Sequence, residues 1–328
     1  MPEYVLFSLL AALLFAGLNL TQKLTVRFAI PQQAVLLFHL FLTQALFAPL
    51  IWLFHPIQGP GPVWGILMIQ TAINVLATAL FYYSLYRVDL SVLGPMWSLK
   101  NLFNALLGFF VLHEVFAPTA YLWIALCLLG AVLTSFNEEL RWKAFLQPSI
   151  LLLFVTFALF STSDLLIRQC IAGGMDAWNQ RAWSMLLEGG IPLLMLPFLR
   201  ERVRVKLPQF ASVVGINLFL ILGTVAISQA FSYPGSFTLA STLVMLETPF
   251  MLLAMGGLTL WKGQILESHP AWIYGIRLWG IGFLSGAALF LARGGFEPLG
   301  FLLFFLPAAL VGSRLLQTAP ATGGRTPG

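Results

Sequence analysis

The chain has 328 residues, of which 59% are hydrophobic and only 9% are charged. A soluble domain carries about 25% charged residues, and a mean hydropathy of +0.90 leaves too little polar surface to face water. The apolar runs recur along the whole chain and are continuous rather than alternating, so they predict spanning helices and not barrel strands. The net charge of +5 lies in the connectors, where it orients the chain and does not indicate nucleic-acid binding.

A spanning helix needs about 20 apolar residues. Runs near this length predict ten spans, at 4–23, 33–53, 63–86, 90–112, 119–136, 149–169, 178–199, 210–231, 237–260 and 271–292. Residues 299–316 are a candidate eleventh span, interrupted by Pro307, and the tail beyond them is expected to be disordered. The first run follows Glu3 without a basic start, so we expect it to be retained rather than removed as a signal peptide.

The two halves of the chain repeat a pattern of residues. Leu14, Phe15, Asn19, Leu20 and Lys23 recur at identical spacing as Leu159, Phe160, Asp164, Leu165 and Arg168, and Lys100 and Phe103 recur as Glu247 and Phe250. With five spans on each side of a polar connector at 137–148, the second half enters the membrane from the opposite face. We therefore predict an all-α polytopic membrane protein of two inverted five-helix repeats, 1–136 and 149–292, followed by a C-terminal segment at 293–328.

Basic residues gather in the odd-numbered connectors, which would place these connectors in the cytoplasm and the N-terminus outside. They are Lys23, Arg27, Arg87, Arg141, Lys143, Arg200, Arg202, Arg204, Lys206 and Lys262. Only Arg168 and Arg181, both near predicted helix ends, fall in the even-numbered connectors.

A stretch from Tyr82 to Phe136 carries several short motifs. They are Asp89-Leu90-Ser91 with Pro95, Ala105-Leu106-Leu107-Gly108, His113-Glu114, and Leu129-Gly130-Ala131-Val132-Leu133; looser counterparts are Phe237-Thr238-Leu239-Ala240-Ser241, Glu267, Gly280, Gly282 and Gly286. This pattern resembles the EamA-like branch of the drug/metabolite transporter superfamily. The resemblance implies ten helices in two inverted repeats, and a central cavity built from helices 1, 3, 4, 6, 8 and 9. It also implies cytoplasmic termini, opposite to the orientation that the basic residues favour, and both orientations stay open.

Lys100 and Glu247 each lie ten residues into a predicted span, about 15 Å deep. A charge at that depth costs about 2.5–3.5 kcal/mol on insertion scales, so each should face a cavity or a partner. Lys100 could bind a substrate carboxylate or pair with Glu247; Glu247 could bind an ammonium group, carry a proton or neutralise Lys100. A zwitterion inserted between them would be an amino-acid-like substrate.

Other polar residues extend this candidate substrate site. Asn101 and Asn104 accompany Lys100, and Trp97 lies three residues before it on the same helix face. Asn19 is the repeat counterpart of Asp164, and Asn74 belongs to the third span. Interhelical hydrogen bonding is the alternative for Asn74 and for His39, Gln44, Asn217 and Gln229. Tyr82, Tyr83 and Tyr86 are predicted to form an aromatic belt at a membrane interface.

Asp164 and Glu188 are candidates for proton coupling. Asp164 is four residues before Arg168, so an ion pair along one helix face is the alternative. Glu188 precedes Gly189-Gly190 and Pro192, which should kink or break the seventh helix. Its carboxylate could bind a proton or a cation, or accept hydrogen bonds from backbone freed at the break.

These features predict a secondary active transporter of a small polar, amino-acid-like metabolite that works by alternating access. An enzyme is not predicted, because no catalytic motif is visible. No ATP-binding loop, metal motif or cofactor motif is present; Cys127 and Cys170 have no ligand spacing. The partners expected are a small-molecule substrate and membrane lipid, with a homodimer left open. The location expected is a bacterial inner (cytoplasmic) membrane. A lipid or lipid-linked metabolite flippase and an intramembrane enzyme remain as alternatives.

Overall fold

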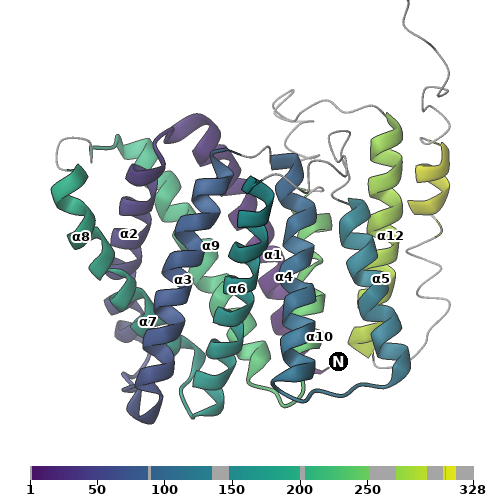
Figure 1. Cartoon of the computed structure of the whole chain (residues 1–328), viewed down its shortest axis with the longest axis horizontal. Helices are drawn as coiled ribbons and strands as arrows, with labels where there is room; N and C mark the ends of the chain where they lie inside the picture. The colour runs from purple at the N-terminus through teal and green to yellow at the C-terminus, as the bar shows by residue number, and fades with distance from the viewer. Residues whose placement is uncertain are drawn as a thin grey trace, which may run out of the picture.

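A computed structural model describes residues 2–87, 90–134, 148–199, 204–251, 254, 271–293, 306 and 308–314. All regular elements in these ranges are helices, which stand side by side as columns of one bundle (Figure 1). They are α1 (Glu3–Leu24), α2 (Gln33–Phe54), α3 (Trp64–Leu85), α4 (Leu90–Phe110), α5 (Pro118–Thr134), α6 (Pro148–Ala172), α7 (Ala177–Glu188), α8 (Gly190–Leu199), α9 (Leu207–Phe231), α10 (Phe237–Val244) and α12 (Ala271–Arg293). Most of the predicted connector at 137–148, Glu267 and the C-terminal tail lie outside the described residues, as does most of the candidate eleventh span.

Within the described residues, five helical stretches are long and apolar enough to cross a membrane. They are Glu3–Ala29, Gln33–Phe54, Gly61–Leu85, Leu151–Ala172 and Leu207–Phe231. Large apolar side chains project outward from them; on α1, for example, Leu6, Leu10 and Leu13 are all about half exposed. Hydrocarbon rather than water is the solvent that suits such a surface. The prediction of a helical, multi-pass membrane protein is therefore confirmed at this level.

The main helix contacts join elements far apart in the chain. α1 packs against α9 and α10, α6 packs against α3 and α4, α2 packs against α7, and α5 packs against α12. The two halves of the chain are thus interleaved within one bundle, and neither half packs mainly on itself.

Glycines allow close contact between α1 and α9. A methyl group on Gly17 would come within 2.6 Å of the Phe219 ring, and one on Gly223 would come within 2.7 Å of the Phe15 ring. Each helix therefore places an aromatic ring against a glycine of the other. Such small-residue notches let membrane helices approach closely and gain dispersion contacts.

The seventh span is broken, as its sequence predicted. Asp176 caps the start of α7 by accepting hydrogen bonds from Trp178 N and Asn179 N, at 2.9 and 3.0 Å. The helix ends at Glu188, and α8 starts at Gly190. Pro192 explains the break, because it has no N–H to donate to the carbonyl of Glu188 four residues earlier.

The predicted span at 237–260 is not one uninterrupted helix. α10 ends at Val244, Met245 and Leu246 form a turn, and helical backbone resumes at Glu247. Thr248 N bonds the carbonyl of Met245 at 3.1 Å, three residues back, since Pro249 cannot make the usual bond to that carbonyl. Glu247 therefore lies directly after a break, where irregular backbone can line a cavity. Residues 252–253 and 255–260 lie outside the described residues.

Glu114, of the His113-Glu114 motif, follows α4 in the chain and caps the start of α10. Its Oε1 and Oε2 accept hydrogen bonds from Phe237 N and Thr238 N, both at 3.0 Å. A carboxylate in this place satisfies two orphan donors and complements the positive end of the helix. The close approach depends on Gly108, where a methyl group would lie 2.1 Å from Thr238 Oγ1.

We expect Glu114→Ala to destabilise the fold by roughly 1–3 kcal/mol, because both buried N–H groups lose their acceptor. Glu114→Gln retains one carbonyl oxygen and should fall between Ala and the unmodified protein. Thermal unfolding in detergent would rank the three proteins. Equal unfolding temperatures for all three would show that the cap does not support α10.

Candidate functional site

A cavity lies between helices from both halves of the chain. Its volume is about 130 Å³, which is enough to hold several water molecules. Its polar lining combines charged groups with amides and hydroxyls. The charged members are Lys100, Asp164, Arg181 and Glu247, and the uncharged ones include Asn19, Gln22, Gln44, Gln70, Asn74, Thr78, Asn101, Ser163, Gln180 and Thr224. Such a lining suits a small polar molecule better than an apolar one.

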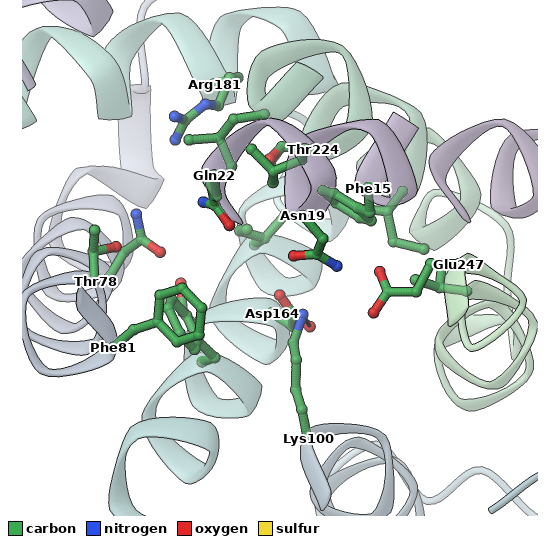
Figure 2. A pocket seen from close by; sticks show the side chains of 18 of the residues that line it. Phe15, Asn19, Gln22, Thr78, Phe81, Lys100, Asp164, Arg181, Thr224 and Glu247 are labelled. Atoms are coloured by element: carbon green, nitrogen blue, oxygen red, sulfur yellow. Dashed lines mark ion pairs between the residues drawn. The ribbon is translucent and has the colours of Figure 1, made fainter. Parts of the chain in front are cut away.

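Lys100 and Asp164 form an ion pair across two helices. Lys100 Nζ of α4 lies 2.8 Å from Asp164 Oδ2 of α6, and the side chains are 19% and 14% exposed. Figure 2 shows both groups meeting inside the cavity. Sequence spacing offered Arg168 as the partner of Asp164, and that intrahelical pairing is wrong: the partner comes from another helix.

A neighbouring hydrogen-bond network holds this pair. Asn104 Nδ2 donates to Asp164 Oδ2 at 2.9 Å and to Ser241 Oγ of α10 at 3.1 Å. Ser161 Oγ donates to the backbone carbonyl of Lys100 at 2.8 Å. Asn104 is buried and is not part of the cavity lining, so it orients Asp164 from behind.

Glu247 adds a second carboxylate to the cavity. It is 9% exposed and interacts electrostatically with Lys100. In Figure 2 its carboxylate points toward the space near Asn19, Lys100 and Asp164. With Lys100, Asp164 and Glu247 all ionised, this cluster of three carries a net charge of −1, which a bound cation or a proton would neutralise.

A second ion pair lies elsewhere on the cavity wall. Arg181 Nη1 lies 3.4 Å from Glu188 Oε1, and Arg181 Nη2 donates to Gln44 Oε1 at 2.8 Å. Asn74 Nδ2 also donates to Glu188 Oε1, at 2.8 Å. Glu188 is fully buried behind Arg181 and Asn74 and does not line the cavity. Its carboxylate is held by side chains, so the predicted bonding to freed backbone is not what these contacts show.

Amides and hydroxyls connect α3, α6 and α7 beside this pair. Gln70 Nε2 donates to Ser163 Oγ at 3.0 Å, and Gln70 Oε1 accepts from Ser184 Oγ at 2.8 Å and Gln180 Nε2 at 3.2 Å. Buried interhelical networks of this kind fix the relative rotation of membrane helices. Ser163 precedes Asp164 in the chain, so the network also helps to place the first ion pair.

The cavity brings together most of the residues singled out in the sequence. Asn19, Asn74, Lys100, Asn101, Asp164 and Glu247 all line it. Asn104 and Glu188 lie behind the wall, each bonded to a lining residue. The side chain of Trp97 lies outside the described part of α4. Asn217 is buried apart from the cavity lining and donates to the carbonyl of Leu40 at 3.2 Å.

Sequence reasoning misplaced two of the lining residues. Arg181 was assigned to a helix end, but it is 3% exposed within α7. Tyr82 was assigned to an interfacial belt, but it is 1% exposed and accepts a hydrogen bond from Gln22 Nε2 at 2.9 Å. A signal for Arg181 existed, since Asp176 is a good helix cap and Arg181 falls in the second turn after it. Among the described residues, no group of three metal-binding side chains is present.

Neutralising the two members of the first ion pair should have unequal effects. Lys100→Met leaves Asp164 and Glu247 without a cation, whereas Asp164→Asn leaves Lys100 to neutralise Glu247. Removing one partner of a buried pair costs roughly 3–5 kcal/mol, and partial exposure lowers this figure here. We expect Asp164→Asn to be the most stable variant, Lys100→Met the least, and the double variant to fall between them in thermal unfolding. The reverse order would show that Glu247 does not share the charge of Lys100.

Known proteins resemble this chain in fold and, over part of its length, in sequence. Eighteen chains of solved structures match its fold. One of them, a crystal structure described only as that of a protein, has 16% sequence identity and a TM-score of 0.66, and the match covers 89% of this chain and 98% of the other. At this identity the likeness shows a shared fold alone. No curated protein matches the sequence. Residues 3–136, the first part of the chain, match the model of the EamA-like transporter family.

Proposed function

We propose that the protein is a secondary active transporter of a small polar, amino-acid-like metabolite in a cytoplasmic membrane, and that bacteria are its source. The match of residues 3–136 to the EamA-like transporter family supports a membrane transporter. The observation that carries the rest is the cavity, in which Lys100, Asp164 and Glu247 converge from different helices. Charged groups inside a membrane are costly, and they mark substrate or ion pathways.

The lining residues support two repeats, 1–136 and 149–292, related by inversion. Matching positions contribute in pairs: Phe15 with Phe160, Asn19 with Asp164, Asn74 with Leu220, Thr78 with Thr224, Phe81 with Ile227, and Lys100 with Glu247. Such pairing is what a cavity at the interface of inverted repeats would show. It also gives the cavity polar groups from both halves, so that relative movement of the halves would change the site.

The helix contacts have the same symmetry. Exchanging α1 with α6, α3 with α9, α4 with α10, and α2 with α7 converts the α1–α9 contact into α6–α3, and α1–α10 into α6–α4. The contacts α2–α7 and α5–α12 convert into themselves. This supports ten spans in two equivalent sets of five, with the broken second-half helices counted once each. Alternating access would then exchange the two arrangements of one pseudo-symmetric bundle.

The charges favour a substrate with an ammonium group. Asp164 and Glu247 provide two carboxylates against one ammonium of Lys100, so a substrate cation completes the neutralisation. Asn19 and Asn101 offer amide oxygens and N–H groups nearby. When no substrate is bound, a proton on this carboxylate pair would serve the same purpose, which would couple transport to a proton gradient. Asp164 lines the cavity and is better placed for this role than Glu188, which is held by Arg181 and Asn74.

Counterflow in liposomes tests this function. Vesicles loaded with amino acids, sugars or organic cations would be offered trace amounts of the labelled compounds. We expect amino acids to enter, and Asp164→Asn to slow entry by about 10- to 100-fold, because the substrate ammonium loses a hydrogen bond to a charged group. Arg204→Ala, an exposed change before α9, is the control and should transport normally.

Other results would redirect the assignment. Entry of sugars or cations instead would discard the amino-acid-like substrate and keep the transporter. Entry of no solute, with transfer of labelled lipid between leaflets, would favour a flippase. Asp164→Glu would check that the asparagine variant fails through lost charge, since it should retain partial activity if the protein remains folded.

A further inference from the structure

Arg181 is the second cation of the cavity, and the amino-acid-like site around Lys100 does not use it. Its side chain is 4% exposed and lies among Gln22, Gln44 and Gln180 on the cavity wall. In Figure 2, Arg181 and Lys100 lie on opposite sides of the cavity, with Asn19 and Asp164 between them. The cavity therefore has two separated charged regions.

The hydrogen bonding of Arg181 is incomplete. Its contact with Glu188 is 3.4 Å long, whereas a charge-assisted hydrogen bond is usually about 2.7–2.9 Å. The Nε atom is buried and has no hydrogen-bond partner among the described residues, and the same is true of Glu188 Oε2. A buried guanidinium with an unused donor calls for an explanation, and a missing ligand provides one.

A planar guanidinium favours carboxylate and phosphate groups, which it can bind through two parallel N–H bonds. Glu188 neutralises Arg181 only loosely, and Gln44 accepts one of its bonds. A carboxylate from the cavity could therefore compete with Glu188 for the guanidinium. The opposite region, with its excess of carboxylates, prefers a cation.

We propose that the substrate is a zwitterion with separated charges, its ammonium between Asp164 and Glu247 and its carboxylate on Arg181. This inference rests on the proposed function and specifies its substrate class as ω-amino acids. An α-amino acid carries both charges on adjacent groups, so it can satisfy one region of the cavity but not span both. Lys100 then balances the carboxylate cluster in the absence of substrate and need not bind the substrate anion.

Three small molecules distinguish a substrate that spans both charged regions from one that binds only one of them. δ-Aminovalerate and L-norvaline are isomers that differ in the distance between their charges, and n-pentylamine has the ammonium alone. Their binding to the full chain in detergent would be measured by thermal shift, because a ligand stabilises the state that binds it. We expect δ-aminovalerate to bind about 10- to 100-fold more tightly than n-pentylamine, the range for a hydrogen bond to a charged group. L-norvaline should bind less tightly than its isomer.

Two variants assign the carboxylate to Arg181. Glu188→Gln removes its competitor, so δ-aminovalerate should bind several-fold more tightly while n-pentylamine is unaffected. Arg181→Gln/Glu188→Gln keeps the same net charge without the guanidinium, and the preference for δ-aminovalerate over n-pentylamine should disappear. Retained binding of n-pentylamine by the double variant shows that it is folded. If it does not bind n-pentylamine, Arg181→Lys replaces it and should keep a reduced preference.

The outcomes distinguish this inference from the function on which it rests. Counterflow of L-norvaline without δ-aminovalerate would leave the transporter intact and refute the two-region site. A preference that survives in the double variant would show that Arg181 is only structural. Equal binding of all three probes would refute any carboxylate site, and counterflow of no amino acid at all would remove the proposed function itself.

Discussion

The need to neutralise charge inside the membrane is the constraint on which the rest of this structure depends. Lys100, on its own helix, would be expensive in hydrocarbon, and Asp164 reaches it from α6 at 2.8 Å. Arg181 is likewise accompanied by Glu188. The Lys100–Asp164 pair requires α4 and α6 to meet at a particular depth. The Arg181–Glu188 pair lies within α7, and Gln44 and Asn74 connect it to α2 and α3. Charged residues that would destabilise isolated helices in the membrane thus limit the ways in which the bundle can assemble.

The same constraint makes the cavity suitable for binding. In the proposed site, the substrate ammonium would neutralise the excess carboxylate beside Lys100, and the substrate carboxylate would complete the hydrogen bonding of Arg181. A fully apolar cavity would offer no such pairing, and a charge with no partner at all would destabilise the empty protein. The paired charges therefore keep the empty state stable, while the carboxylate excess around Asp164 and the unused donor of Arg181 would favour binding.

Much of the cavity could be predicted from the sequence because the repeat is visible there. Asn19 and Asp164 share their spacing with apolar neighbours, and Lys100 and Glu247 stand out as charges in apolar runs. Depth along a helix follows from counting residues, and depth is what brings these groups to one level. The break after Glu188 was equally predictable, since Pro192 has one local effect wherever the helix packs.

The sequence did not reveal how each helix is rotated about its axis, or which helices pack against it. Asp164 has a possible partner one turn away in Arg168, a pairing worth only about 0.2–0.5 kcal/mol on a helix. The stabilisation that Lys100 gains from a counterion is larger, but the identity of that counterion can be seen only when α4 and α6 are packed together. Tyr82 was likewise placed at an interface because hydropathy records the length of a span and not the direction in which a ring points.

The glycine notches between α1 and α9 have a consequence for how the protein is made. Gly17 and Phe219 are about two hundred residues apart, which at ribosomal rates of 5–20 residues per second corresponds to roughly 10–40 s of synthesis. Throughout that interval α1 is in the membrane without the helix that fills its notch. The contact between α1 and α9 can therefore form only after about two thirds of the 328 residues have been synthesised, and until then lipid or the insertion machinery would cover this face of α1.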